Sequence, residues 1–304
     1  MKLSRELGWY FSKKNMRITH KIAALTATLT TALSLLAAPV MAFSVEATND
    51  IETLKNNLLG ANTGGLSNFS ISISGNAAAS GIFTNDPFGL TSGVVLSTGK
   101  VTDIPGQNRK DNDFMGGSDV STDFLPLGKD GDLIQLSLSF FADSTAEKLF
   151  FEYVFASEEF REYGGSRYND NFELLLNGTN LAKLTDAKTV TINNLVPDRY
   201  NRSNDHPDYI DNPSLTGIAA NIIKLDGFTK VLGFEGLLQK NQTNVLSIRI
   251  KDEYDGLLDS AVFLKGGSVG TIKAEAVPEP MTVGGLMAGG AMLAAGRKLR
   301  SRRK

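Results

Sequence analysis

Apolar and polar side chains alternate with a period of two through the middle of this 304-residue chain, and this pattern constrains the fold more than any other feature. Apolar residues alternate with serine at 69–73 and again at 136–140. Such alternation is typical of strands with one buried face. In the stretch 149–155 both faces are mostly apolar, which predicts a central strand that is buried on both sides. Further strands are predicted at 93–97, 171–176, 189–192, 230–234, 245–250 and 261–264.

Clusters of Gly, Asn, Asp and Pro separate these segments, as they do in antiparallel sandwiches. Helical spacing occurs near the start of this region, at Ile51, Leu54 and Leu58 behind a group of capping residues. We therefore predict an all-β fold, mainly an antiparallel, jelly-roll-like β-sandwich with one short N-terminal helix, and helices in the two terminal targeting segments. Residues 43–272 are expected to form this sandwich as one domain.

Two long polar loops interrupt the predicted strands, at residues 102–132 and 197–215. Long loops without secondary structure are uncommon in compact domains, and those that occur are usually functional or mobile. We expect the same of these two loops.

Charge is distributed unevenly along the chain, although the formal net charge of the whole is only -2. Residues 1–42 and residues 277–304 each contain six basic residues and one acidic residue, which leaves 19 basic and 31 acidic residues between them, a net charge of -12. A body this acidic excludes nucleic acid as a partner, because phosphate binding needs a basic surface, and it permits cation binding. The absence of cysteine excludes disulfides, Cys-based zinc sites and cysteine nucleophiles.

The first 42 residues have the composition of a secretory signal peptide. Residues 1–21 are basic, residues 22–38 are mostly Ala, Leu and Thr, and small residues precede a cleavage site after Ala42. The alternative is a permanent anchor, but the middle stretch is weakly apolar and shorter than the roughly 20 residues that a span needs. We expect export and cleavage after Ala42, with the true start at Met1 or Met16.

The last 28 residues combine three features in order. A short motif comes first and consists of Val277, Pro278, Glu279 and Pro280. The next 16 residues, 281–296, carry no charge, and the tail 297–304 is strongly basic. As a helix, the uncharged stretch rises about 24 Å, less than the roughly 30 Å of a bilayer core. The basic tail would stay in the cytoplasm, which places the body outside.

This order resembles a PEP-CTERM sorting signal, found in bacteria that make exopolysaccharide. The resemblance implies a linker with the motif at 273–280 and a sorting signal at 277–304, made of a short transmembrane segment and a basic tail. It further implies membrane contact before processing, cleavage by an exosortase-like protease, and release to the cell surface or extracellular matrix. The alternative is an ordinary single-span tail.

Four motifs in the body follow one another in a fixed order: GVVLSTG at 93–99, FEYVFASEEF at 151–160, NDNF at 169–172 and DSAVFL at 259–264. Together they resemble the choice-of-anchor L family, which joins one extracellular domain to different anchoring tails. The resemblance implies a surface location and no established activity. Phe160 stands where the family pattern favours tyrosine, which puts a role for a hydroxyl there in doubt.

Acidic and amide residues gather at the ends of several predicted strands. Ca²⁺ is bound by about six to eight oxygens from carboxylates, amides and carbonyls. We therefore predict a calcium site formed by Glu158, Glu159, Asn169, Asp170, Asp252, Asp255 and Asp259. The alternatives are that these are turn residues and caps on an acidic surface, or that Arg161 and Arg167 pair with the two glutamates.

No catalytic residue is predicted. The exported body contains one histidine, His206, in a polar loop, and we expect its imidazole to be exposed to solvent. Neighbouring Glu158 and Glu159 would point to opposite faces of a strand, so they cannot both flank one glycosidic bond.

The sequence thus predicts an exported, non-enzymatic structural or adhesion module of the bacterial surface or matrix, stabilised by calcium. Its expected partners are the export machinery, an exosortase-like protease, and exopolysaccharide or other surface proteins. The alternative is a secreted hydrolase or binding module for extracellular polysaccharide. A hydrolase would use carboxylates after Phe155 and Ile250. Because the only tryptophan is Trp9, sugars would stack on tyrosines, namely Tyr163, Tyr168, Tyr200, Tyr209 and Tyr254.

Overall fold

The computed structural model describes residues 42–109, 124, 132–253 and 258–273. The predicted signal peptide before Ala42, Asp255, Tyr254, the motif at 277–280 and the sorting tail lie outside these residues. Among the residues that are described, no helix is long and apolar enough to cross a membrane.

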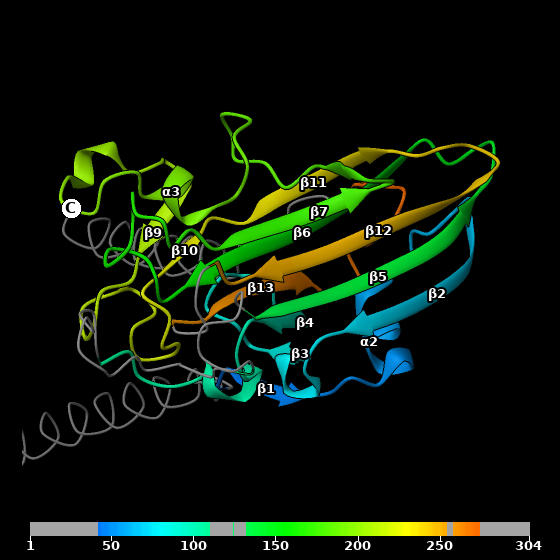
Figure 1. The fold of residues 1–304 in the computed structure, drawn as a ribbon. Helices are drawn as coiled ribbons and strands as arrows, with labels where there is room; N and C mark the ends of the chain where they lie inside the picture. The colour runs from blue at the N-terminus through cyan, green and yellow to red at the C-terminus, as the bar shows by residue number, and fades with distance from the viewer. Residues whose placement is uncertain (1–41, 110–123, 125–131, 254–257, 274–304) are drawn as a thin grey trace, which may run out of the picture. The chain divides into compact units, whose positions relative to one another are not determined.

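Thirteen strands in the described part of the chain form two antiparallel sheets (Figure 1). The larger sheet has the order β1-β3-β4-β13-β6-β10-β9, and β11 also pairs with β6. Its strands are β1 (Ser44–Ala47), β3 (Ser80–Thr84), β4 (Ser92–Ser97), β6 (Lys148–Ser157), β9 (Tyr209–Asp211), β10 (Gly227–Thr229), β11 (Leu232–Leu237) and β13 (Ser260–Lys265). The all-β sandwich prediction is confirmed.

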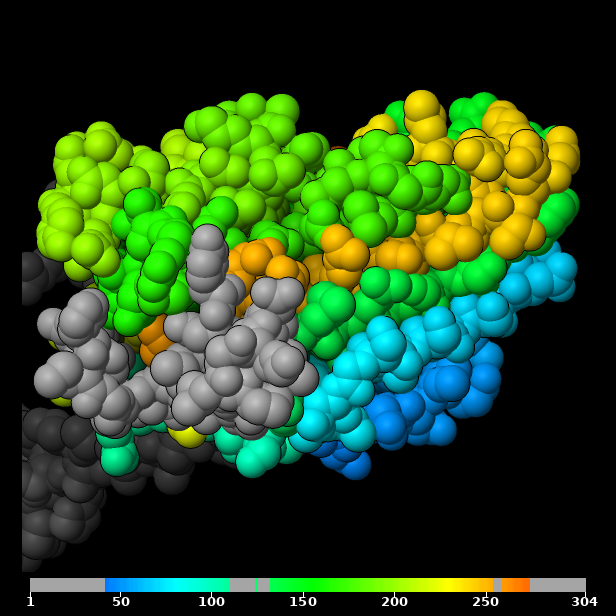
Figure 2. All heavy atoms as spheres, viewed as in Figure 1, coloured from blue at the N-terminus to red at the C-terminus, as the bar shows by residue number. Residues whose placement is uncertain are grey.

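The smaller sheet has the order β2-β5-β12-β7-β8. Its strands are β2 (Leu66–Ser74), β5 (Leu133–Ala142), β7 (Asn171–Leu176), β8 (Thr179–Asn180) and β12 (Gln242–Lys251). Figure 2 shows several of them running side by side across one face of the molecule. On its outward side, Ser72, Ser137 and Ser247 lie in one row of the ladder, and Ser137 Oγ lies 3.2 Å from Ser247 Oγ. The serine alternation in the sequence therefore marks the solvent side of this sheet.

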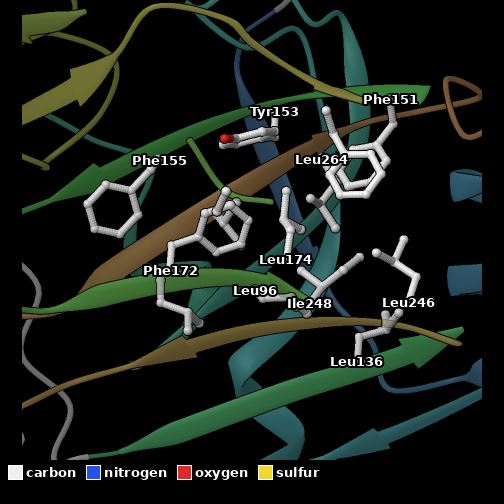
Figure 3. Packing of buried hydrophobic residues seen from close by; sticks show 14 of the residues in the cluster. Leu96, Leu136, Phe151, Tyr153, Phe155, Phe172, Leu174, Leu246, Ile248 and Leu264 are labelled. Carbon is white, nitrogen blue, oxygen red and sulfur yellow. The ribbon is translucent and has the colours of Figure 1, made fainter. Parts of the chain in front are cut away.

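The main core lies between the two sheets (Figure 3). Phe151 of β6 stacks on Phe234 of β11 with ring centroids 4.5 Å apart, and Tyr153 lies 5.1 Å from Phe172 of β7. Each fully buried side chain of this size contributes about 1.5–3 kcal/mol by leaving water. The first contact lies within the larger sheet, and the second joins the two layers, since β6 and β7 belong to different sheets.

A second, smaller core covers part of the outer side of the larger sheet. It includes Val154 and Ala156 of β6 together with Phe228 and Phe263. The prediction that β6 is buried on both sides holds at this end of the strand. Near its start, Phe150 and Glu152 are only half-buried, because the second core does not extend over β11.

The predicted helix is α2 (Ile51–Leu58), with Leu54 and Leu58 buried. It begins because the Asp50 carboxylate accepts a hydrogen bond from the Thr53 N–H at 2.8 Å, which satisfies a free donor of the first turn. Hydrogen bonding from the Thr53 side chain first, and from its backbone N–H second, lowers the pKa of Asp50. The remaining short helices are α3 (Ile192–Leu195), η1 (Ala77–Ala79), η2 (Val101–Asp103) and η3 (Arg202–Asn204).

The strand predicted at 189–192 is wrong. Thr191 caps α3 instead, since its hydroxyl oxygen accepts a hydrogen bond from the Asn194 N–H at 3.1 Å. Val190 and Ile192 are both buried, as the apolar pattern required. However, Thr189 and Thr191 each form only an isolated β-bridge, and no continuous ladder of paired residues is present there. A short apolar run can be buried without being a strand.

Candidate functional site

Antiparallel pairing brings several strand termini to one end of the sandwich. Ser157, the last residue of β6, pairs with Ser260, the first of β13, while Lys251 at the end of β12 pairs with Asn171 at the start of β7. Acidic residues directly flank these termini. We call this set the acidic end: Asp132, Glu158, Glu159, Asp170, Asp252 and Asp259. All six side chains are buried, with at most 3% of the residue exposed.

Asp170 links the two sheets within the acidic end. Its Oδ2 accepts a hydrogen bond from the Ser260 hydroxyl of the larger sheet at 2.6 Å, and its Oδ1 accepts from the Glu253 N–H beyond β12 at 3.0 Å. The Ser260 Oγ also lies 2.8 Å from Ser157 Oγ. One carboxylate thus joins the smaller sheet, where it precedes β7, to the larger one.

Asp259 fits against the end of β4. Its Oδ1 accepts a hydrogen bond from the Thr98 hydroxyl at 3.2 Å, and a Cβ atom at Gly99 would collide with its carboxylate. Only glycine leaves room for this approach. The motifs at 93–99 and 259–264 therefore contact each other, through Thr98 and Gly99 of the first and Asp259 of the second.

The acidic end contains five of the residues predicted to bind calcium: Glu158, Glu159, Asp170, Asp252 and Asp259. The prediction missed Asp132, which directly precedes β5 and whose carboxylate accepts from the Phe124 N–H at 2.8 Å. The Oδ1 of Asn169 accepts from the Asn193 N–H of α3 at 2.8 Å. Within the described ranges, no group of three or more His, Asp or Glu side chains is arranged to hold a metal ion.

Of the alternatives weighed for these acids, turn residues on an acidic surface and a pairing of Arg161 with the two glutamates are wrong, while a pairing with Arg167 stays a prediction. The acidic end is buried, so its members are not turn residues on an acidic surface. Arg161 forms ion pairs with Asp205 and with Asp211, whose Oδ1 lies 3.6 Å from the Arg161 Nε. Burial of charged groups on this scale is tolerated only where hydrogen bonds compensate for lost water.

His206 is buried, with 8% of the residue exposed, so the prediction of an exposed imidazole is wrong. Its Nδ1 accepts a hydrogen bond from the Asp208 N–H at 3.1 Å, and its Nε2 lies 3.3 Å from the Asp186 Oδ1. A neutral ring that accepts at Nδ1 carries its proton on Nε2, where it can donate to Asp186. The histidine therefore connects two loops.

The loop predicted at 197–215 is ordered around a cavity of 220 Å³. We call it the arginine cavity; it is lined by Phe160, Arg161, Glu162, Arg199, Arg202, Asp211, Pro213 and Asp226. The loop contributes η3 and β9, and the lining continues to Asp226 before β10. Part of the loop that was expected to be functional or mobile therefore forms one wall of a pocket.

Arg161 lies at the centre of the contacts around this cavity. Its backbone has a φ of 78°, in the left-handed region that is uncommon for residues other than glycine. The guanidinium donates through Nη2 to Asp205 and lies over the Tyr209 ring, 5.5 Å from its centroid. Burial alone would lower the pKa of Arg161, but its contacts with Asp205, Tyr209 and Asp211 raise the pKa above its ordinary value.

Asp211 accepts two hydrogen bonds and lies near a third side chain that carries a positive charge. The Tyr209 hydroxyl donates to its Oδ1 at 2.9 Å, Arg202 donates to its Oδ2, and Arg161 lies close by. Burial first, and the negative charge of Asp211 second, raise the pKa of Tyr209, so that its hydroxyl stays protonated. The Asp211 carboxylate is thus oriented by hydrogen bonds from Tyr209 and Arg202.

The sequence prediction missed the arginine cavity, because its charged residues come from segments about 40 positions apart. A signal was present in the recurrence of arginine next to tyrosine. Arg199 lies over the ring of Tyr200 at 4.9 Å, and Arg167 over that of Tyr168 at 5.0 Å. Cation–π pairs of this kind mark arginines that are held in place rather than freely solvated.

Comparison with known proteins gives one informative match. The model of the Choice-of-anchor L domain matches residues 44–270, which contain all four motifs. No curated protein matches the chain. A solved structure of a family 35 carbohydrate binding module from an environmental isolate is similar at 10% identity, over 59% of this chain and 99% of that chain, with a TM-score of 0.20. This similarity is too low to support an argument about either fold or function.

Proposed function

Because this chain belongs to the choice-of-anchor L family, we propose that it is an exported, non-enzymatic structural or adhesion module of the bacterial surface or extracellular matrix. Family membership indicates an extracellular or cell-surface protein. The finer assignment, to adhesion or matrix structure, is supported by the state of the acidic end.

The observation that carries this proposal is the burial of the carboxylates that a hydrolase would use. Glu158 and Glu159 follow β6 with 2% and 1% exposure. Asp252 follows β12 and Asp259 precedes β13, both with no exposure. General acids and bases must come within hydrogen-bond reach of a substrate. A polymer outside the protein cannot reach buried carboxylates, so this arrangement favours a structural role over hydrolysis.

We propose that both ends are removed during export. The signal peptide would be cut after Ala42, and the tail would contact the membrane through residues 281–296 before an exosortase-like protease cleaves near the motif at 277–280. The family match ends at residue 270, just before this motif, which supports a separate role for the tail.

Mass spectrometry of the protein washed from producing cells tests this processing. We expect a chain that begins at Phe43 and lacks residues 281–304. Glu279→Gln should leave an uncut form in the membrane fraction, whereas Lys273→Gln, a charge change outside the motif, should be processed normally. Recovery of surface protein with residues 281–304 intact would contradict the proposal.

Calcium at the acidic end is a separate proposal. Carboxylate oxygens concentrated at one end suit this ion, with Asp255 and backbone carbonyls as further ligands. Several of these oxygens already accept protein donors, as at Asp170 and Asp259. We expect millimolar Ca²⁺ to raise the melting temperature of the mature protein relative to excess chelator, and Mg²⁺ to do so less. Equal melting temperatures in Ca²⁺ and chelator would reject the site.

A polysaccharide-binding role is the second candidate, and the ring of Tyr200 favours it. This residue is 83% exposed and adjoins Arg199 of the arginine cavity. Exposed tyrosine rings offer an apolar face with a polar handle, which suits stacking against sugars. Co-sedimentation of the mature protein with the extracellular polymer of its own cells tests this role, and absence of retention would count against it.

A further inference from the structure

Arginine is scarce in the acidic body but concentrated at one cavity. Residues 43–276 contain six arginines: Arg109, Arg161, Arg167, Arg199, Arg202 and Arg249. Three of these line the arginine cavity. In a body with a net charge of -12, this grouping is a local feature that the overall charge would not produce.

Within the described residues, the three guanidinium groups have more N–H donors than hydrogen bonds to the protein. Each guanidinium has about five N–H donors in a planar fork. Within the described residues, each makes one hydrogen bond: Arg161 to Asp205, Arg199 to the Glu162 carbonyl at 2.7 Å, and Arg202 to Asp211. The Nε and Nη1 atoms of Arg161 are buried without a hydrogen-bond partner. The surplus calls for an acceptor-rich ligand, since planar guanidinium groups match carboxylates in two parallel bonds.

The cavity also contains carboxylates that can accept hydrogen bonds. A ligand that fits it must therefore carry hydrogen-bond donors as well as acceptors. Glu162, Asp211 and Asp226 are among the lining residues. The Oδ1 of Asp205, beside Arg161, is buried without a hydrogen-bond partner. An isolated anion would satisfy the arginines but would repel these carboxylates. A ligand that carries a carboxylate next to hydroxyl groups supplies acceptors to the arginines and donors to the aspartates at once.

Size and surroundings favour one unit of a longer chain. The volume of 220 Å³ is below the roughly 300–1,000 Å³ of pockets that enclose drug-sized ligands. Beside it, the exposed ring of Tyr200 can contact a neighbouring unit outside the cavity. An acidic side chain of a peptide would fit the volume, but it lacks hydroxyl donors beside its carboxylate.

We propose that the arginine cavity binds the carboxylate-bearing sugar unit of an acidic polysaccharide, with Arg199 and Arg202 holding the carboxylate and Tyr200 contacting the next sugar. This inference rests on the polysaccharide-binding role proposed above and names its ligand class and its residues.

Calorimetry with a galacturonic acid oligomer tests the site in the mature protein at about 0.15 M salt, where long-range repulsion is screened. The methyl-esterified oligomer keeps the hydroxyls but loses the charge, and inorganic phosphate offers the charge without the sugar. We expect binding of the acid form, at least tenfold weaker binding of the ester, and no competition by equimolar phosphate. Equal binding of acid and ester, or displacement by equimolar phosphate, would overturn the ligand class.

Substitutions of the two arginines test whether they bind the sugar carboxylate. Arg199→Gln and Arg202→Gln should each weaken oligomer binding at least tenfold, because each removes charge-assisted hydrogen bonds. The matched control is Arg249→Gln in β12, which breaks a comparable surface pair with Glu173 of β7 and should leave binding unchanged. The side chain of Arg202 is 63% exposed, so this variant should fold with an unchanged melting temperature. Equal losses in Arg202→Gln and Arg249→Gln would overturn the site.

Two outcomes separate this inference from the role on which it rests. Retention on the cells' own polymer that persists in Arg202→Gln would refute the arginine cavity and leave the polysaccharide-binding role standing. Binding of the galacturonic acid oligomer without retention on that polymer would support the cavity and refute the role.

Discussion

The acidic end and the arginine cavity both include residues of the turn after β6. They differ in how far their charged groups are hydrogen-bonded to the rest of the protein. At the acidic end, carboxylates such as Asp170 and Asp259 accept hydrogen bonds from hydroxyls and backbone N–H groups of neighbouring strands. In the arginine cavity, Arg199 and Arg202 each use one donor on the protein. Within five residues, from Glu158 to Glu162, the chain passes from one region to the other.

This difference separates charges that hold the fold from charges that are available to a ligand. Removing a partner from a buried, hydrogen-bonded charge leaves other buried groups unsatisfied and destabilises the fold. Removing an exposed charge from a cavity rim changes stability little, because such pairs are screened by water. Substitutions at the acidic end should therefore affect unfolding, and substitutions at the cavity rim should affect binding.

The largest effect on stability is expected from Asp170→Ala. The substitution removes the charged acceptor of both the Ser260 hydroxyl, which keeps Ser157 Oγ within 2.8 Å, and the Glu253 N–H, and each hydrogen bond to a charged group contributes about 1.5–3 kcal/mol. We expect a loss of roughly 3 kcal/mol or more in the free energy of unfolding, measured in urea. Asp170→Asn, which keeps one acceptor, should lose less.

The matched control is Asp143→Ala, at an exposed turn where the carboxylate accepts from the Thr145 N–H at 2.7 Å. Its loss should be much smaller than that of Asp170→Ala. If the two alanine variants lose equal stability, the acidic end does not hold the fold together.

A somewhat smaller loss is expected from Gly99→Ala. The new methyl group would displace the Asp259 carboxylate, and overpacking of this kind costs about 1–3 kcal/mol. Gly233→Ala in β11 is the control, because no other heavy atom lies within 4 Å of its added Cβ. Equal stability of the two variants in thermal unfolding would show that the Asp259 carboxylate can move away from residue 99 at little cost in free energy.

At the cavity rim, Arg202→Gln should change the free energy of unfolding by less than about 1 kcal/mol, as for other exposed ion pairs. Its binding of the galacturonic acid oligomer should nevertheless fall at least tenfold. A large loss of stability with unchanged binding would contradict this expectation. It would mean that Arg202 stabilises the fold and does not bind the ligand.

The smallest effect concerns an exposed carboxylate, Asp186. Hydrogen bonds from Lys188 lower its pKa from 3.8 to about 2. Because the pKa in the folded protein is below that of the unfolded chain, the contribution to stability is present above pH 3.8 and is lost as the pH falls toward 2. Lys188→Gln should return the pKa toward 3.8 in a carboxyl NMR titration, whereas Lys240→Gln should not change it. An unchanged pKa in Lys188→Gln would reject the Lys188 contribution.

Much of the fold was predictable because its long strands alternate. β5, β7 and β12 follow the period of two, and their strands were found close to their observed bounds. β9 and β10 were missed because three residues are too few to show a period. The sequence around Thr191 misled because burial alone cannot distinguish a strand from a short capped helix.

The acidic end was largely predictable, since its residues directly flank strands that pair with one another. What could not be predicted was their burial, which depends on how the two sheets stack. The arginine cavity was not predictable, because Arg161 and Arg199 meet only through the path of the loop before β10. Local sequence indicates residue types, but tertiary structure decides which of them remain available to a ligand.

A crystal structure of the mature protein with the galacturonic acid oligomer would show whether the arginine cavity binds the ligand while the acidic end holds the fold. We expect a sugar carboxylate within hydrogen-bond distance of Arg199 and Arg202, an adjacent sugar against Tyr200, and an acidic end in which Asp170 still bridges Ser260 and Glu253. An oligomer bound at the acidic end against Glu158 or Asp259, with the arginine cavity empty, would contradict this expectation.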